Sequence, residues 1–312
     1  MNQSLPMEGL LRCIDRADEE WPAGLLELGP HKIPKRLFVD GKRLPDIRKA
    51  IAIVGTRRPT AAGLEITSTM SLAFAEAGLT VVSGLAVGID SAAHRETLRA
   101  GGVTVAVMGC GLDVDYPQRN RRLKAEIRRR GSLVTEYESG TRPLAHHFPD
   151  RNRIVAGLVS GVVVVEGGER SGALITARRA LDANRAVWAV PGSVRNPMAV
   201  GPNALIRNGE ASLVTSPQDV FDELAPGLVW DQVVDRLAPA KVSLGEDECA
   251  VIRLLDDAPL ASERVCVDLQ WPAGRVAMAL SCWEVRGLAA RRPTGYELSQ
   301  GGARLRARLE CE

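Results

Sequence analysis

The chain of 312 residues is 45% hydrophobic and 25% charged, which is the composition of an ordinary soluble globular protein. Its length suits one large domain, or a large domain with a small one. The net charge of +2 gives no indication of nucleic-acid binding, so any such site has to come from local clusters of basic residues. No stretch reaches the ~20 apolar residues of a membrane span, and we expect a cytoplasmic protein without a membrane partner.

The six cysteines are scattered, and none belongs to a Cys-x-x-Cys pair. This spacing argues against a zinc site and a disulfide framework, and it predicts reduced thiols. The adjacent His146 and His147 lack a third ligand at a suitable spacing, so we predict no metal site. The start of the chain carries Glu8 and has no long apolar run, which argues against a signal peptide.

The first 49 residues are predicted to form a small N-terminal cap, because Pro22, Pro30 and Pro34 interrupt their short apolar segments. From residue 50 onward, short apolar and β-branched runs recur along the chain. Such runs predict strands buried on both faces, as in parallel sheets. The predicted strands are residues 51–54, 79–82, 103–108, 133–135, 162–165, 187–190 and 213–215.

Helical stretches separate these strands, at residues 63–77, 90–100, 120–130, 151–159 and 174–183. The alternation predicts an α/β domain over residues 50–224, built on a doubly wound, mostly parallel sheet. In such domains, ligands bind at the carboxyl ends of the strands, where loops run into the N-termini of helices.

Proline and glycine mark a linker over residues 225–241. Residues 242–312 then contain three short helical segments and a hairpin whose turn holds Pro293 and Gly295. This is the outline of a small winged-helix-like domain. Its many arginines leave two roles open, contact with duplex DNA and contact with another protein.

The loop after the first strand of the large domain contains Gly55, Thr56, Arg57 and Arg58. This combination at a strand–helix turn predicts an anion site. Backbone N–H groups and the helix dipole favour phosphate, and arginine adds bidentate hydrogen bonds. The Gly-x-Gly-x-x-Gly fingerprint of dinucleotide-binding proteins is absent, so we predict no cofactor.

The loop after the second strand contains Ser83, Gly84 and Gly88 and leads into Asp90. Glycines allow the backbone to approach a ligand closely, so we place Ser83, Gly84 and Gly88 in the phosphate-binding site. Asp90 is predicted to cap the following helix. His94, one turn further along, is predicted to have a structural role.

Phe148 lies close to Arg151, Asn152 and Arg153 in the segment after the fourth strand. Proteins hold unstacked bases and their phosphates with aromatic rings and basic side chains, so these four residues are predicted to contact single-stranded nucleic acid. The aromatic content of only 4% indicates that contacts to the phosphate backbone dominate over stacking.

The loop after the fifth strand is glycine-rich and ends at a helix N-terminus, with Arg170, Ser171 and Gly172 followed by Thr176. The arginine, the hydroxyl and the amides predict a second anion cradle. Several anion-binding loops on one edge of the sheet favour a polymeric ligand over a mononucleotide.

In order along the chain, these loops resemble the motifs of the DprA/Smf family of DNA-processing proteins. The matching segments are VGTR at 54–57, SGLA at 83–86, GID at 88–90, AH at 93–94, YP at 116–117, FP at 148–149, RNRI at 151–154, SG at 171–172, LITA at 174–177 and PG at 191–192. The resemblance runs from about Trp21 to Leu224. It implies an extended Rossmann-like fold and a homodimer that binds single-stranded DNA and loads the RecA recombinase during natural transformation.

The resemblance also implies roles for single residues. Arg57 would grip a DNA phosphate, and Arg170 stands where the family has a basic residue that contacts DNA. Thr56 replaces the commoner serine and keeps the hydroxyl. The N-terminal helical module of many members is not expected here, because few residues precede Trp21.

The alternative is an enzyme related to the Rossmann-like nucleotide phosphoribohydrolases. Those proteins have a catalytic glutamate shortly after a glycine-rich loop, whereas residues 173–176 of this chain contain no carboxylate. Hydrolysis would then depend on Asp90, Glu136 or Glu166 as general acid or base. We therefore favour a non-catalytic DNA-binding protein.

Overall fold

The computed structural model describes residues 11–224, 250–251, 253–255, 259–285, 289–298 and 306. The chain divides into two compact units, Met1–Leu237 and Ala238–Glu312. The predicted linker at residues 225–241 lies outside the described residues, as does part of the first helix predicted for the C-terminal domain.

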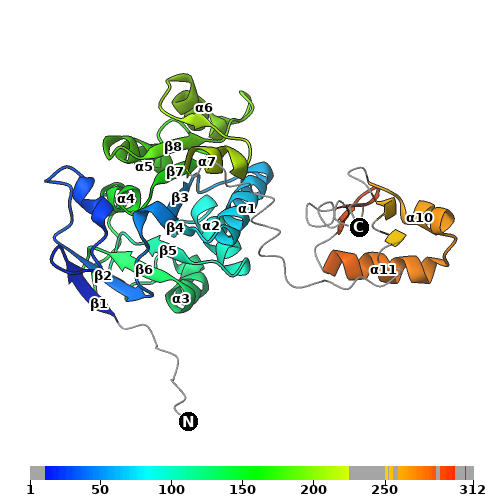
Figure 1. Ribbon diagram of the computed structural model, residues 1–312, viewed down its shortest axis with the longest axis horizontal. Helices are drawn as coiled ribbons and strands as arrows, with labels where there is room; N and C mark the ends of the chain where they lie inside the picture. The colour runs from blue at the N-terminus through cyan, green and yellow to red at the C-terminus, as the bar shows by residue number, and fades with distance from the viewer. Residues whose placement is uncertain are drawn as a thin grey trace, which may run out of the picture. The chain divides into compact units, whose positions relative to one another are not determined.

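A sheet of nine strands forms the centre of the described part of the first unit, in the order β1-β2-β6-β5-β4-β3-β7-β8-β9 (Figure 1). From β6 to β9 in this order the neighbouring strands are parallel. Strands β1 and β2 are antiparallel and extend the sheet beyond β6. The bounds are β1 Arg12–Asp15, β2 Arg36–Gly41, β3 Ala50–Val54, β4 Thr80–Ser83, β5 Thr104–Val107, β6 Ser132–Thr135, β7 Gly161–Val164, β8 Ala186–Ala189 and β9 Ser212–Leu213.

Helices connect the parallel strands, which confirms the predicted doubly wound α/β fold. The α-helices are α1 Ala61–Glu76, α2 Ile89–Arg99, α3 Arg121–Arg130, α4 His147–Gly157, α5 Gly172–Asp182, α6 Val200–Arg207 and α7 Pro217–Leu224. Short 3-10 helices lie at Ala23–Glu27, Ile47–Lys49, Gln118–Asn120 and Pro197–Ala199. From β3 the chain builds outward through β4, β5 and β6, and then returns to the other side of β3 with β7, β8 and β9. The carboxyl ends of β3 and β7 are therefore neighbours at the point where the winding reverses, which is where such sheets leave a crevice for ligands.

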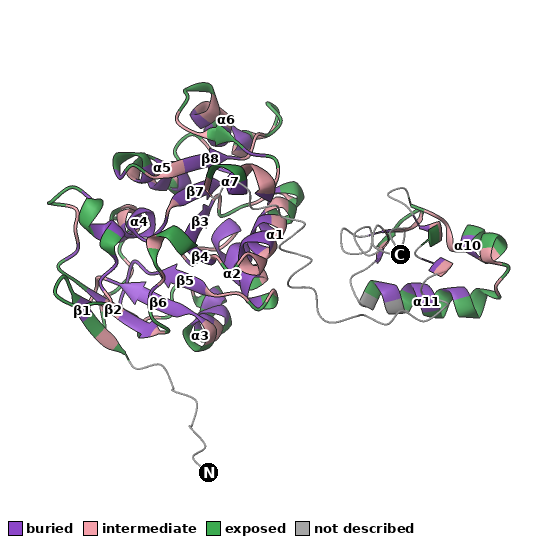
Figure 2. Cartoon of the chain, in the orientation of Figure 1, coloured by how far each residue is buried: buried purple, intermediate pink, exposed green. Residues whose placement is uncertain are grey.

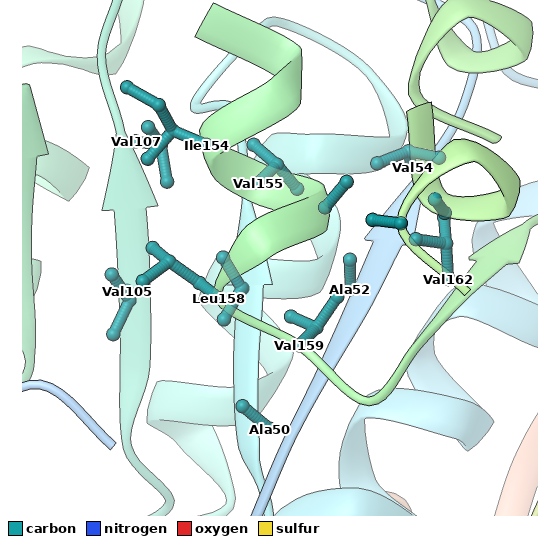
Figure 3. Packing of buried hydrophobic residues seen from close by; sticks show 14 of the residues in the cluster. Ala50, Ala52, Val54, Val105, Val107, Ile154, Val155, Leu158, Val159 and Val162 are labelled. Carbon is teal, nitrogen blue, oxygen red and sulfur yellow. The ribbon is translucent and has the colours of Figure 1, made fainter. Parts of the chain in front are cut away.

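Strand β3 is buried on both faces, because helices cover both sides of the sheet. Alternate residues of a strand point to opposite faces. Ala50, Ala52 and Val54 pack on one face with Val155 of α4 and with Leu158, which follows this helix (Figure 3). The small alanines leave room for the helix to lie close to the sheet.

The opposite face of the sheet carries the second part of the core. Ile51 and Ile53 pack there with Phe74 of α1, Trp188 of β8 and Phe221 of α7. The central strands are accordingly buried along their length, whereas the outer sides of the helices are exposed (Figure 2). The rigid core thus fixes the strand ends from which the loops of the crevice emerge.

The described part of the first 49 residues, predicted as a cap, supplies β1 and β2 and shares the main core. Trp21, Leu25 and Leu37 are buried in the same cluster as the central strands. Leu25 packs on Gly157 of α4, where a Cβ would lie 2.5 Å from the Leu25 side chain. The segment therefore completes the sheet and covers the end of α4.

The second unit contains α10 (Ser262–Leu269), α11 (Ala273–Val285) and the hairpin β10–β11 (Ala289–Arg292 and Gly295–Leu298). Leu260 forms an isolated bridge with Tyr296, next to the hairpin. Trp283 is fully buried among residues such as Val265 and Leu280. Two helices and a hairpin lie where they were predicted, and the winged-helix assignment stays a prediction.

Candidate nucleic-acid interface

A cavity of about 870 Å³ lies at the carboxyl ends of the parallel strands. Loops from six strands, β3 to β8, contribute to its wall. The lining includes Gly55, Thr56, Arg57, Arg58, Gly84, Ala86, Asp90, Tyr116, Phe148, Arg151, Asn152, Arg170, Ser171, Gly172, Thr176 and Met198. The structure therefore brings together all of the predicted site residues except Ser83, Gly88 and Arg153.

Three exposed arginines flank the crevice between β3 and β7. Arg57 and Arg58 follow β3, and Arg170 follows β7. Within the described residues, none of the three forms an ion pair with an acidic side chain. Their charges are therefore available to an external anion.

An aromatic pair stands beside these arginines. The guanidinium carbon of Arg57 lies 5.9 Å from the ring centroid of Phe148, within cation–π range. The ring of Phe148 is 5.3 Å from that of Tyr116, and the two planes are tilted by 34°. One wall of the cavity thus combines a cation with two partly exposed ring faces.

A recess of about 50 Å³ opens between this aromatic pair and the floor of the cavity. Apolar groups such as Val87, Met108 and Pro117 line it, together with Cys110. Burial raises the pKa of the Cys110 thiol, which keeps it protonated and unreactive. The recess accordingly offers apolar contact and no nucleophile.

Arg151 differs from the exposed arginines because it is buried in the cavity floor, where only 5% of its surface is exposed. Its Nη1 donates a hydrogen bond to the carbonyl oxygen of Val107. A Cβ on Gly84 would lie 2.5 Å from this guanidinium, so Gly84 provides the room for it. Burial lowers the pKa of Arg151, and Asp90 acts in the opposite direction. Arg151 therefore contributes a fixed positive charge beneath the ligand space.

Asp90 does not cap helix α2 as predicted. The helix begins one residue earlier, at Ile89, and Gly88 occupies the cap position with φ of 89°. The Asp90 Oδ2 accepts hydrogen bonds from the backbone N–H groups of Gly84 at 3.1 Å and Ala86 at 3.4 Å. Burial raises the pKa of Asp90, while the charge of Arg151 lowers it. The carboxyl group thus closes the loop between β4 and α2.

The remaining three predicted site residues lie outside the cavity lining. The Ser83 hydroxyl donates to the carbonyl oxygen of Ile53 at 2.7 Å and links two strands. Gly88 packs against the backbone of the loop after β3, where a Cβ would lie 2.3 Å from the carbonyl oxygen of Thr56. Arg153 forms a half-buried ion pair with Glu136 at 2.6 Å.

The N-terminus of α5 faces the cavity. Ser171 caps the helix by accepting a hydrogen bond from the backbone N–H of Ala173 at 3.1 Å. Asn152 and Thr176 both donate to the carbonyl oxygen of Gly172, at 3.2 and 3.3 Å. This end of α5 therefore presents its positive dipole to the ligand space, and its role as an anion cradle stays a prediction.

The N-terminus of α1 differs from the prediction, because Glu166 occupies it. The Glu166 carboxylate accepts hydrogen bonds from the backbone N–H and the hydroxyl of Thr60, at 2.9 and 2.6 Å. The Thr56 hydroxyl donates to the Met198 sulfur at 3.2 Å. The dipole of α1 is thus satisfied internally. Sequence reasoning missed this contact because Thr60 and Glu166 are 106 positions apart.

Two of the cavity residues outside the predicted set, Tyr116 and Met198, come from the loops after β5 and β8. Tyr116 had a sequence signal in the Tyr-Pro motif. Met198 had none, because it sits in a short 3-10 helix that only tertiary structure places at the crevice. Helix α6, which follows it directly, was likewise not predicted.

Two of the described histidines, His94 and His147, have structural contacts. Burial lowers the pKa of His94 to about 3, and its Nδ1 lies 2.6 Å from the Thr104 hydroxyl. His147 stacks on Tyr137 with ring centroids 4.0 Å apart. The described part of the chain holds no cluster of three or more His, Cys, Asp or Glu side chains suited to a metal ion. It also contains no helix with the length and apolar character to cross a membrane.

The model of the family described as DNA recombination-mediator protein A matches residues 12–225 of this chain. Protein Smf of Escherichia coli is 42% identical over 216 residues, which cover 69% of this chain and 57% of that protein. The chain thus spans less than two thirds of the length of this relative. DNA processing protein DprA of Streptococcus pneumoniae is 44% identical over 208 residues, covering 66% of this chain and 72% of the relative.

Two solved structures are similar to this chain in both sequence and fold. The X-ray structure of DNA processing protein A from Streptococcus pneumoniae superposes with a TM-score of 0.64 at 42% identity, over 68% of this chain and 74% of the other. DNA processing protein A from Helicobacter pylori, known for a single-stranded DNA binding mode, superposes with a TM-score of 0.62 at 29% identity, over 69% and 95% of the two chains. From its sequence match and its fold, this chain belongs to the DNA recombination-mediator protein A (DprA/Smf) family.

Proposed function

We propose that this chain binds single-stranded DNA in the cavity at the carboxyl ends of β3 to β8. The observation that carries the proposal is the pair of arginine-bearing loops on either side of the crevice. Arg57 and Arg58 lie on one side and Arg170 on the other, and none of them has an acidic partner among the described residues. Such charges bind phosphates and release counterions, so the affinity falls steeply with salt.

The cavity also suits unpaired bases. Phe148 and Tyr116 offer ring faces next to Arg57, and ring faces stack on any base regardless of sequence. In duplex DNA the bases already stack on each other, so these faces have no base to accept. We therefore propose a preference for single strands with little sequence selectivity.

The three carboxylates considered for the phosphoribohydrolase alternative are all engaged in contacts within the protein. Glu136 is paired with Arg153, and Glu166 is buried under three hydrogen bonds. Asp90 lines the cavity, but backbone N–H groups of its own loop hold its Oδ2. The geometry thus favours a protein that binds without catalysis. Rapid release of free base from purine nucleoside monophosphates would reverse this proposal.

We further propose that the protein acts as a homodimer and loads the RecA recombinase onto incoming DNA during natural transformation. The proposed dimer and RecA loading rest on membership in the family, and we assign no surface of the chain to either. The test is whether the purified protein speeds RecA filament formation on single strands coated with single-strand-binding protein. Its mass in solution tests the dimer.

For the second unit, the two predicted roles remain contact with duplex DNA and contact with protein. Arg292 pairs with Glu297, and Arg306 donates to the carbonyl oxygen of Leu255, so both side chains have contacts within the unit. Duplex binding measured with and without residues 241–312 distinguishes the two roles.

The central experiment is fluorescence anisotropy with a labelled oligonucleotide, as a single strand and as a duplex, over a salt series. We expect tighter binding of the single strand and a linear fall of log affinity with log salt. Preference for the duplex, or no binding at low salt, would overturn the proposal.

A further inference from the structure

Glu166 is a buried carboxylate with an unusual position for a protein that binds an anionic polymer. It lies two residues after the end of β7 and is 6% exposed. It accepts three hydrogen bonds: two from Thr60, at 2.9 and 2.6 Å, and one from the side chain of Asn196 at 3.3 Å. One side chain thus connects the loops that follow β3, β7 and β8.

The carboxylate lies against the first turn of α1. A Cβ on Gly63 would be 2.4 Å from the Glu166 Oε2, so glycine at this position makes the approach possible. Thr60 completes the arrangement by capping α1, since its hydroxyl accepts from the backbone N–H of Gly63 at 3.0 Å. A helix N-terminus attracts anions. In this fold Glu166 is that anion, and no phosphate is needed there.

A second set of contacts joins the same three loops. The Met198 backbone N–H donates to the Asn196 Oδ1 at 2.9 Å, and the Met198 carbonyl oxygen accepts from Gly167 at 2.6 Å. The Met198 sulfur accepts the Thr56 hydroxyl at 3.2 Å. Glu166 and Met198 therefore hold the loop of Arg57 from two sides.

We propose that Glu166 is a positioning residue for DNA binding. Its carboxylate replaces phosphate at the N-terminus of α1 and holds the loop from Gly55 to Thr60 in the shape that directs Arg57 toward the cavity. The DNA phosphates are then bound by the arginines and by the N-terminus of α5. This inference rests on the proposed binding of single-stranded DNA.

Whether Glu166→Gln raises or lowers the affinity for DNA distinguishes a positioning role from simple electrostatic repulsion. A negative charge near the DNA path repels phosphates, so Coulomb's law alone predicts that Glu166→Gln strengthens binding. If Glu166 positions Arg57, the same substitution weakens binding. The NH2 group of the glutamine would then face a group that donates a hydrogen bond to the carboxylate in wild type, and that hydrogen bond would be lost. Glu169 is a matched control. It lies in the same loop and is exposed, and it has no hydrogen bond or ion pair among the described residues.

The test measures the affinity for a labelled single strand by anisotropy in wild type, Glu166→Gln, Glu169→Gln, Arg57→Ala and the double variant Glu166→Gln/Arg57→Ala. We expect Glu166→Gln to bind about tenfold more weakly, as for loss of one charged contact. Its salt slope falls by about 0.7, the value for one phosphate of a single strand. Glu169→Gln binds as tightly as wild type or more tightly. The double variant is no weaker than Arg57→Ala, because both changes remove the same contact.

As a control for folding, each variant is titrated at a DNA concentration far above the dissociation constant. The end point of this titration gives the fraction of protein molecules that can bind DNA. If Glu166→Gln fails to fold, Asn196→Ala replaces it, because it removes one donor to Glu166 and one acceptor for Met198. About threefold weaker binding with a lower salt slope is then expected. Equal or tighter binding by Glu166→Gln, or additive losses in the double variant, overturns the inference while Arg57→Ala still binds weakly. Unchanged affinity in Arg57→Ala instead contradicts the proposed function itself.

Discussion

The loops after β3 and β7 flank the same crevice, yet they use their helix N-termini in opposite ways. At α1 the carboxylate of Glu166 fills the N-terminus from inside the protein. At α5 the N-terminus is capped by Ser171 and faces the cavity. A strand–loop–helix unit is therefore not by itself an anion site. A neighbouring loop decides whether the helix dipole is available to a ligand.

The two loops also differ in how tightly they are packed. A Cβ on Gly88 would meet the backbone of the loop after β3, 2.3 Å from the Thr56 carbonyl oxygen. A Cβ on Gly172, at the start of α5, would meet no atom within 4 Å. The loop of Arg57 is therefore fixed by its neighbours, whereas the start of α5 is open to solvent and ligand.

The largest expected effect is a difference in stability between alanine variants of these two glycines. Gly88→Ala should lower the free energy of unfolding by about 2 to 3 kcal/mol, because φ of 89° suits only glycine and the added methyl group meets backbone. Gly172→Ala should change it by less than about 0.5 kcal/mol, as for an exposed site. Urea unfolding of both variants measures the difference. Equal losses would contradict the difference in packing.

A second prediction concerns the charges on the two sides of the crevice. Arg57→Ala and Arg170→Ala should each weaken binding of a single strand about tenfold, because each removes a charged hydrogen bond to phosphate. The double variant should lose about 100-fold if the two arginines bind different phosphates. Anisotropy at fixed salt measures all three. A loss confined to one of the arginines would show that DNA follows one side of the crevice only.

The smallest expected difference is in stability between variants of the two residues that cap α1 and α5. Ser171→Ala should cost about 1 kcal/mol of stability, as for a typical cap. Thr60→Ala should cost about 2 kcal/mol, because Thr60 both caps α1 and donates to Glu166. Thermal unfolding of the two variants gives the comparison. A larger loss for Ser171→Ala would show that the contact with Glu166 contributes little to stability.

Local patterns predicted much of this arrangement. The apolar runs located the parallel strands, and the glycine and arginine motifs located the loops of Arg57 and Arg170. Contacts between distant segments were not predictable in the same way. Arg151 and Arg153 look equivalent in sequence, but one lies in the cavity floor and the other pairs with Glu136. Helical periodicity separates residues two apart onto different faces, and only packing reveals which face meets the ligand.

The same limit explains Glu166 and the first strands. Glu166 was considered as a general acid or base because its partner Thr60 lies far away in sequence and could not be recognised. Strands β1 and β2 are separated by turns and a 3-10 helix rather than by a longer helix, so they lacked the regular spacing of the parallel strands. Antiparallel pairing at the edge of the sheet gives little signal in a single sequence.

The salt dependence of single-strand binding tests the central claim most directly. The slope of log affinity against log salt is compared between wild type and Arg57→Ala with one oligonucleotide. We predict a steep dependence in wild type and a slope smaller by about 0.7 in the variant, with weaker binding of all sequences alike. An unchanged slope and affinity would contradict the assignment of Arg57 to a DNA phosphate, and with it the cavity as the binding site.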